Sequence, residues 1–162
     1  MKRILVTNDD GVLSEGLRAL ADALRPLGTV TVVAPIVEAS AIGHALTLRR
    51  PLRLERHGDG IYSVDGTQTD CVNVGIAQVL KGMPDLVVSG INKGWNLGDD
   101  VTYSGTVAGA MEAALLGIPA LAVSLQYPRG AELDFTQSAR VGHEVAASIL
   151  RHGLPSRVFL NV

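Results

Sequence analysis

Two adjacent carboxylates, Asp9 and Asp10, directly follow a short apolar run at the start of the sequence. Like charges repel in a partly buried site and raise the pKa of one of the two groups, which makes the pair costly there. A divalent cation bound between them removes this cost. An Asp-Asp-Gly segment is also typical of an exposed turn, but its position directly after a predicted strand favours a metal site.

Neutral oxygen ligands follow two other predicted strands. Ser40 lies in the loop after the second strand, and Asn92 follows the third. Alone, each is more typical of a loop hydroxyl or a turn residue. With the aspartates they form an all-oxygen set, which suits Mg²⁺ or Mn²⁺, with Ca²⁺ as a substitute in crystals, better than zinc. The sequence therefore predicts one divalent metal ion.

Ser104, Gly105 and Thr106 open an alanine-rich helical segment. A helix N-terminus offers unpaired N–H groups, the glycine lets an anion approach the backbone, and both hydroxyls can donate. The alternative is an ordinary N-terminal cap. The predicted metal ligands nearby favour a phosphate site.

Two further side chains lie on the predicted rim. His44 is either a proton donor or an ordinary loop residue. Trp95, in a glycine-rich loop, can stack on a base or pack against a neighbouring subunit. The sequence contains no G-x-x-x-x-G-K-[ST] loop, no G-x-G-x-x-G after the first strand and no G-x-S-x-G, so these nucleotide-binding and serine-hydrolase motifs are excluded.

Short apolar runs rich in β-branched residues alternate with helical patterns along most of the chain. Nearly continuous apolar runs indicate strands covered on both faces, as in a parallel sheet. The pattern predicts an α/β fold, a Rossmann-like doubly wound sheet that is mostly parallel, with a β-hairpin inserted within residues 46–64. The predicted strands are 4–7, 29–34, 85–89, 120–124 and 158–162, and the predicted helices are 15–27, 70–81, 106–116 and 135–152, with Ser14 and Thr69 as caps.

Composition limits the remaining possibilities. A chain of 162 residues is expected to form one domain, residues 1–162. Its formal charge of −2, without a basic cluster, argues against a nucleic-acid polymer as ligand. Charged residues make up only 19%, below the usual figure of about 25%, so a homo-oligomer that covers apolar surface is expected. A single cysteine, Cys71, and the lack of a signal or membrane-spanning stretch indicate a cytoplasmic protein.

Several motifs in order resemble the SurE family, the survival-protein nucleotidases. They are ILVTNDDG at 4–11, VVAP at 32–35, Ser40, TDCV at 69–72, SGIN at 89–92 and SGTV at 104–107. The resemblance implies a metal-dependent 5′-nucleotidase of Rossmann-like fold. It also implies that Asp9, Asp10, Ser40 and Asn92 hold the metal and that Asn96, Ser104, Gly105 and Thr106 surround the phosphate, and Asn8 is counted among the substrate-binding candidates.

The chain departs from the family pattern at Ile36, Ala39, Gln68 and Trp95, and the last two replace prolines. Family members continue past Val162 with segments that help to hold dimers and tetramers together. The expectation is therefore a homodimer or homotetramer, and a chain that lacks this C-terminal extension.

The predicted activity is hydrolysis of nucleoside 5′-monophosphates, with 3′-monophosphates and polyphosphate as further candidates. A metal-activated water attacks phosphorus, and Asp9 or Asp10 accepts its proton. Two alternatives remain open: a phospho-aspartyl phosphatase, although the usual Asp-x-Asp spacing is missing, and a non-catalytic module that binds nucleotides or phosphate.

Overall fold

The computed structural model describes residues 1–38, 42–127 and 130–162. Its strands form one sheet of seven in the order β3-β4-β2-β1-β5-β6-β7. All neighbours are parallel except β3 and β4, which form the antiparallel hairpin at one edge. The strands are β1 Arg3–Thr7, β2 Thr29–Pro35, β3 Leu54–Gly58, β4 Ile61–Val64, β5 Leu86–Lys93, β6 Ala120–Leu125 and β7 Phe159–Asn161.

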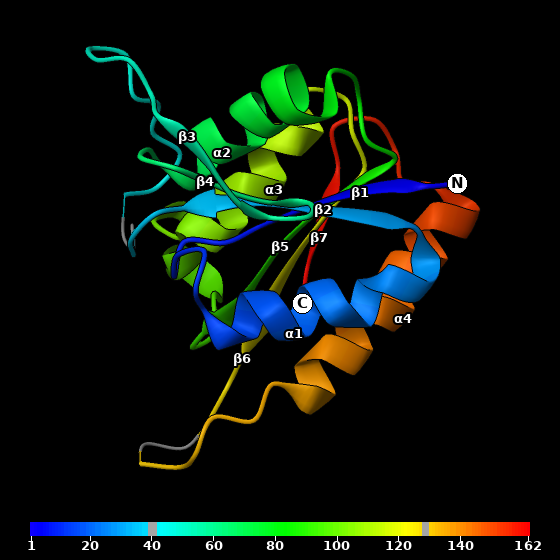
Figure 1. The fold of residues 1–162 in the computed structure, drawn as a ribbon. Coiled ribbons are helices and arrows are strands. Elements are labelled where there is room, and N and C mark those ends of the chain that lie inside the picture. The colour runs from blue at the N-terminus through cyan, green and yellow to red at the C-terminus, as the bar shows by residue number, and fades with distance from the viewer. Residues whose placement is uncertain (39–41, 128–129) are drawn as a thin grey trace.

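Helices cover both faces of the sheet, with α1 and α4 on one side and α2 and α3 on the other (Figure 1). Within the described residues, none of them is long and apolar enough to cross a membrane. The helices are α1 Glu15–Leu24, α2 Gln68–Val74, α3 Gly105–Leu115 and α4 Thr136–His152, with shorter segments η1 Arg25–Leu27, η2 Gly75–Leu80 and η3 Gly98–Thr102.

Successive residues of the central strands enter two separate cores. On β1, Ile4 and Val6 pack on the α1 side, and Leu5 packs on the α3 side. All three side chains are fully buried. Burial on both faces is the reason for the continuous apolar runs, and the predicted doubly wound α/β fold is confirmed.

The predicted hairpin is confirmed, but its strands begin only at Leu54, and Leu46 and Leu48 lie exposed before them in irregular chain. The cap of α2 is Thr67 instead of Thr69, because Thr67 and Asp70 form a reciprocal capping box. The even spacing of the leucines fits irregular chain as well as a strand, and Thr67 and Thr69 are both suitable caps by residue type. Asp70, three positions after Thr67, decides the cap, because it completes the capping box.

Strand β5 is longer than the run 85–89 that the sequence indicated, and a β-bulge makes the extension possible. Its register with β6 shifts between Gly90 and Asn92, so Ile91 is the extra residue. A side chain at Gly90 would place its Cβ 2.3 Å from the Val123 carbonyl oxygen, and φ there is +136°. Glycine is therefore required at the bulge, which changes the direction of the side chains that follow.

Candidate functional site

The carboxylate of Asp9 is buried at the carboxyl end of β1 and is held from α3. Thr106 Oγ1 donates a hydrogen bond to Asp9 Oδ1 at 2.5 Å. Asp9 is 4% exposed and Thr106 is fully buried. Burial raises the pKa of Asp9, and the hydroxyl of Thr106 works in the opposite direction by stabilising the charged form. The bond thus fixes the orientation of a carboxylate whose ionised form is destabilised by burial.

Asp10 is the less satisfied of the two carboxylates. Among the residues that the structure describes, none donates to its buried Oδ2 atom. Its pKa is raised by burial and, next, by the negative charge of Asp9, and the Lys93 ammonium partly offsets the rise. An unpaired carboxylate oxygen beside a second carboxylate is the situation that a bound cation relieves.

The bulge in β5 brings Asn92 to the same rim. Its Nδ2 donates to the Gly94 carbonyl oxygen at 2.9 Å, so the side-chain oxygen is the atom suited to a cation. Asn92 lines a pocket of about 260 Å³ that Asp9 also lines. Segments 83 residues apart therefore meet, as expected for the carboxyl ends of neighbouring parallel strands.

The pocket also contains two of the predicted phosphate-binding residues, Asn96 and Ser104. Asn96 is held from two sides, since its Nδ2 donates to Ser124 Oγ at 2.8 Å and its carbonyl oxygen accepts from Asn161 Nδ2 at 2.8 Å. The remaining lining residues are Trp95, which the sequence already marked as a possible stacking residue, and Lys93, Asp100 and Tyr103, which sequence reasoning did not select.

Lys93 is the most informative of these unselected residues, because an ammonium group in a pocket attracts a phosphate dianion. The signal was present in the sequence, directly after Asn92. It could not be interpreted, since an isolated lysine after a strand is usually a solvated surface residue.

The first residues of α3 position Asp9, in addition to any contact they make with a ligand. Ser104 caps the helix, accepting from the Val107 N–H at 3.2 Å, and its hydroxyl hydrogen remains able to donate. A Cβ at Gly105 would lie 2.7 Å from Asp9 Cβ and 2.6 Å from Gln68 Nε2. Glycine is needed here for the close approach of the helix to Asp9. Direct contacts of Gly105 and Thr106 with phosphate stay a prediction.

Three further residues from the sequence analysis have other positions. Asn8 is buried, and its Nδ2 donates to the Gly11 carbonyl oxygen at 3.0 Å, which braces the turn that follows β1. His44 contacts Glu112 of α3, with 2.6 Å between Nε2 and Oε2, and this contact ties down the loop after β2. Ser40 lies outside the described residues, so its role as a ligand stays a prediction.

The residues present fit a hard divalent cation. Asp9, Asp10 and Asn92 supply oxygen atoms, and Asp10 Oδ2 is buried without a partner among the described residues. No group of three or more His, Cys, Asp or Glu that could hold a metal occurs in the described parts of the chain. By type, the oxygen donors of Asp9, Asp10 and Asn92 match the carboxylate and carbonyl ligands of Mg²⁺ or Mn²⁺ better than the nitrogen and sulfur ligands typical of zinc.

The fold and site define a Rossmann-like α/β protein with an acidic, oxygen-lined pocket at the carboxyl edge of its sheet. The family described as "Survival protein SurE" matches residues 4–162, and the chain belongs to this family. The resemblance inferred from the motifs is thereby confirmed.

Curated relatives and a solved structure agree with this assignment. The chain is 60% identical to the 5′-nucleotidase SurE of Pelobacter propionicus and 58% identical to that of Geobacter sulfurreducens, and each match covers 98% of this chain. The crystal structure of the Aquifex aeolicus SurE protein superposes with a TM-score of 0.93 at 45% identity, over 98% of this chain and 64% of that one. The chain spans 64% and 60% of the two relatives' lengths.

Proposed function

We propose that this chain is a divalent-metal-dependent phosphatase that hydrolyses nucleoside 5′-monophosphates. The observation that carries the proposal is the pairing of a fixed carboxylate, Asp9, with an unsatisfied one, Asp10, beside a pocket that Asn96 and Ser104 also line. The name 5′-nucleotidase SurE, borne by relatives up to 60% identical, supports the substrate class. 3′-monophosphates and polyphosphate remain further candidates.

A cation held by Asp9, Asp10, Asn92 and, by prediction, Ser40 would polarise a phosphate oxygen and acidify a bound water. The chain's own residues have distinct parts in the reaction. Asp10, whose buried Oδ2 has no donor among the described residues, is suited to accept the proton of the attacking water. Asp9 is suited to stay in place, because Thr106 holds it.

Substrate binding is assigned to the uncharged and cationic residues that line the pocket. The Lys93 ammonium attracts the phosphate dianion, and the hydroxyl hydrogen of Ser104 can donate to one of its oxygens. Asn96 is held by its contacts with Ser124 and Asn161, so little conformational entropy is lost when it binds an oxygen.

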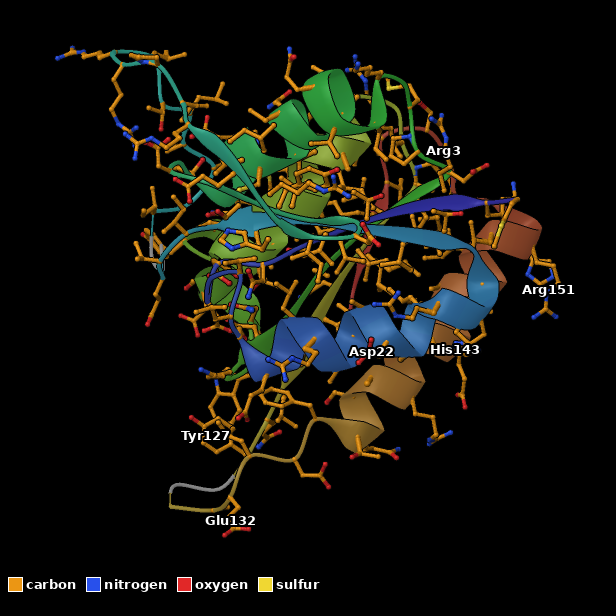
Figure 2. All side chains as sticks on the ribbon, in the orientation of Figure 1. Arg3, Asp22, Tyr127, Glu132, His143 and Arg151 are labelled. Atoms are coloured by element: carbon orange, nitrogen blue, oxygen red, sulfur yellow. The ribbon has the colours of Figure 1, made fainter. Side chains whose placement is uncertain are left out.

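The test is phosphate release from AMP with Mg²⁺, with Mn²⁺ and in EDTA. Activity should require metal, and Asp9→Asn should lower kcat by about 100-fold or more, the contribution typical of a catalytic proton acceptor or oriented ligand. Asp22→Asn is the matched control, since Asp22 lies on the exposed side of α1 and pairs with Arg25 (Figure 2). Full activity in EDTA, or equal losses in both variants, would contradict the proposal.

Further measurements separate the two alternatives from the proposed activity. In a phospho-aspartyl mechanism, Asp9 or Asp10 would displace the nucleoside from phosphorus and water would then cleave the new P–O bond, so rapid acid quenching during turnover should trap a phosphorylated aspartate. A non-catalytic module would bind AMP in calorimetry without metal-dependent phosphate release. The burial of Asp9 and its bond to Thr106 disfavour Asp9 as a nucleophile.

We also propose that the chain forms a homodimer or homotetramer. Large apolar side chains that are more than half exposed, among them Leu13 and Leu48, supply surface that a second copy can cover. Sedimentation at several protein concentrations tests this, and a monomer throughout the series would refute it.

A further inference from the structure

Trp95 lies between two hollows of the surface. It lines the candidate site together with Asp9 and Ser104, and it also lines a neighbouring hollow of about 380 Å³. The second hollow is formed by Gly94, Trp95, Gln126 and Tyr127. Trp95 is 53% exposed and Tyr127 is 37% exposed, so two aromatic side chains offer open surface directly beside the predicted phosphate site.

Two hydrogen bonds attach the loop of Trp95 to the end of β6, the strand that Tyr127 follows. Gly94, which precedes Trp95, donates its N–H to the Leu125 carbonyl oxygen at 2.9 Å. Asn96, which follows Trp95, donates from Nδ2 to Ser124 Oγ at 2.8 Å. The loop after β5 is thus fastened on both sides of Trp95 to the end of β6.

Tyr127 comes two residues after β6 ends. Figure 2 shows Tyr127 where the chain leaves β6, below α1 in this view. The position is at the carboxyl edge of the sheet, where the predicted metal ligands also lie. One ligand could therefore extend from the candidate site into this hollow.

We propose that this hollow is the nucleobase subsite and that Trp95, with Tyr127, stacks on the base of a nucleoside monophosphate. The inference rests on the proposed function, because it takes the phosphate to lie near Ser104. The described lining residues of the hollow carry no charge, which suits a neutral heteroaromatic ring better than a second phosphate. The Gln126 amide can both donate to and accept from the edge of a base.

Stacking accepts any base, since every base presents an aromatic face, so all four common nucleoside monophosphates should bind. Purines have the larger ring surface and should bind most tightly. Selectivity for one base depends on a single amide, Gln126, and is expected to be modest.

Intrinsic fluorescence tests binding without any need for turnover. Trp95 is the only tryptophan of the sequence, so emission excited at about 295 nm reports this residue alone. In EDTA, AMP and adenosine should quench the emission saturably, and ribose 5-phosphate should not. Absence of quenching by adenosine and AMP, or equal quenching by ribose 5-phosphate, would overturn the subsite.

Activity provides the second test. Trp95→Ala should lower kcat/KM for AMP by about 5- to 100-fold relative to its effect on ribose 5-phosphate, which has no base to stack. Leu97→Ala is the matched control, because Leu97 is an exposed side chain of the same loop that lines neither hollow. It should leave both rates within about twofold of the unmodified chain.

The remaining outcomes separate the two proposals. If neither AMP nor ribose 5-phosphate is hydrolysed but adenosine still quenches saturably, the proposed function fails and the base subsite stands. If Trp95→Ala slows both substrates equally, or shifts sedimentation to a smaller species without changing the ratio of the two rates, Trp95 shapes the loop or a subunit contact. Either result would overturn the base subsite.

Discussion

Replacing Thr106 with valine removes the hydrogen bond that holds Asp9 while nearly preserving side-chain volume. The donor and acceptor atoms are 2.5 Å apart, and both residues are buried, so water cannot replace the lost hydroxyl. A hydrogen bond to a charged group contributes about 1.5–3 kcal/mol. For a chain of this size the expected fall in Tm is about 3–12 °C at pH 7.

The pH dependence follows from the direction of the pKa shift. Burial raises the pKa of Asp9 above its ordinary value of 3.8, and Thr106 opposes that rise. Valine therefore raises the folded-state pKa of Asp9 further, so the folded variant holds its proton to a higher pH than the unfolded chain does. The free energy of unfolding of the variant should therefore increase as pH falls through that folded pKa. The difference in this free energy between the variant and the unmodified protein should become smaller.

Urea unfolding of the metal-free protein at pH 7 and at mildly acidic pH measures this difference, with Thr106→Ser as the control. Serine keeps the hydroxyl and loses one methyl group, which costs about 1 kcal/mol. Equal unfolding midpoints for Thr106→Val and the unmodified chain would refute the reasoning, as would a serine variant that is as unstable as the valine variant at both pH values.

Three further predictions concern neighbouring residues. Asp10→Asn should raise the Tm of the metal-free protein at pH 7, because burial and the adjacent carboxylate destabilise the ionised form of Asp10. This gain in Tm should fade as pH falls towards 3.8, where the carboxyl group of the unmodified chain becomes protonated. The same variant should also lose the Tm increase that Mn²⁺ causes. Gly105→Ala should destabilise the chain by about 1–3 kcal/mol in urea unfolding through overpacking, since its Cβ would lie within 2.8 Å of neighbouring side-chain atoms, whereas Gly58→Ala, with open space around it, should not. Asn161→Ala should raise KM for AMP by about 2- to 10-fold with kcat largely unchanged, because the carbonyl oxygen of Asn96 loses its donor; an unchanged KM would contradict this.

Local sequence patterns were sufficient for the elements and for part of the site. The continuous apolar run before Asp9 predicted a strand buried on both faces, and β1 has this environment. Ser104 was recognised as a possible cap, and it does accept from the Val107 N–H. The alternation of such runs with helical patterns predicted the fold class, which the likeness to the Aquifex aeolicus protein confirms.

Contacts between distant segments could not be predicted in the same way. Nothing near Thr106 in the sequence shows that its hydroxyl belongs to Asp9, which is 97 positions away. The position of Asn92 depends on a bulge at Gly90 and Ile91, and a bulge has no periodic signal. His44 contacts Glu112, which lies within a helix of mostly alanine and other apolar residues, 68 positions away.

The sequence by itself determined that the central strands are buried on both faces, where most strands and helices lie, and that two carboxylates follow the first strand. These properties depend on side chains a few positions apart, and each leaves a periodic or compositional mark. Only the tertiary structure decided which oxygen atom of Asp9 is occupied, which atom of Asp10 is left unpaired, and that Trp95 and Tyr127 share a hollow. Those features depend on strand order and register, which bring together groups that no local pattern connects.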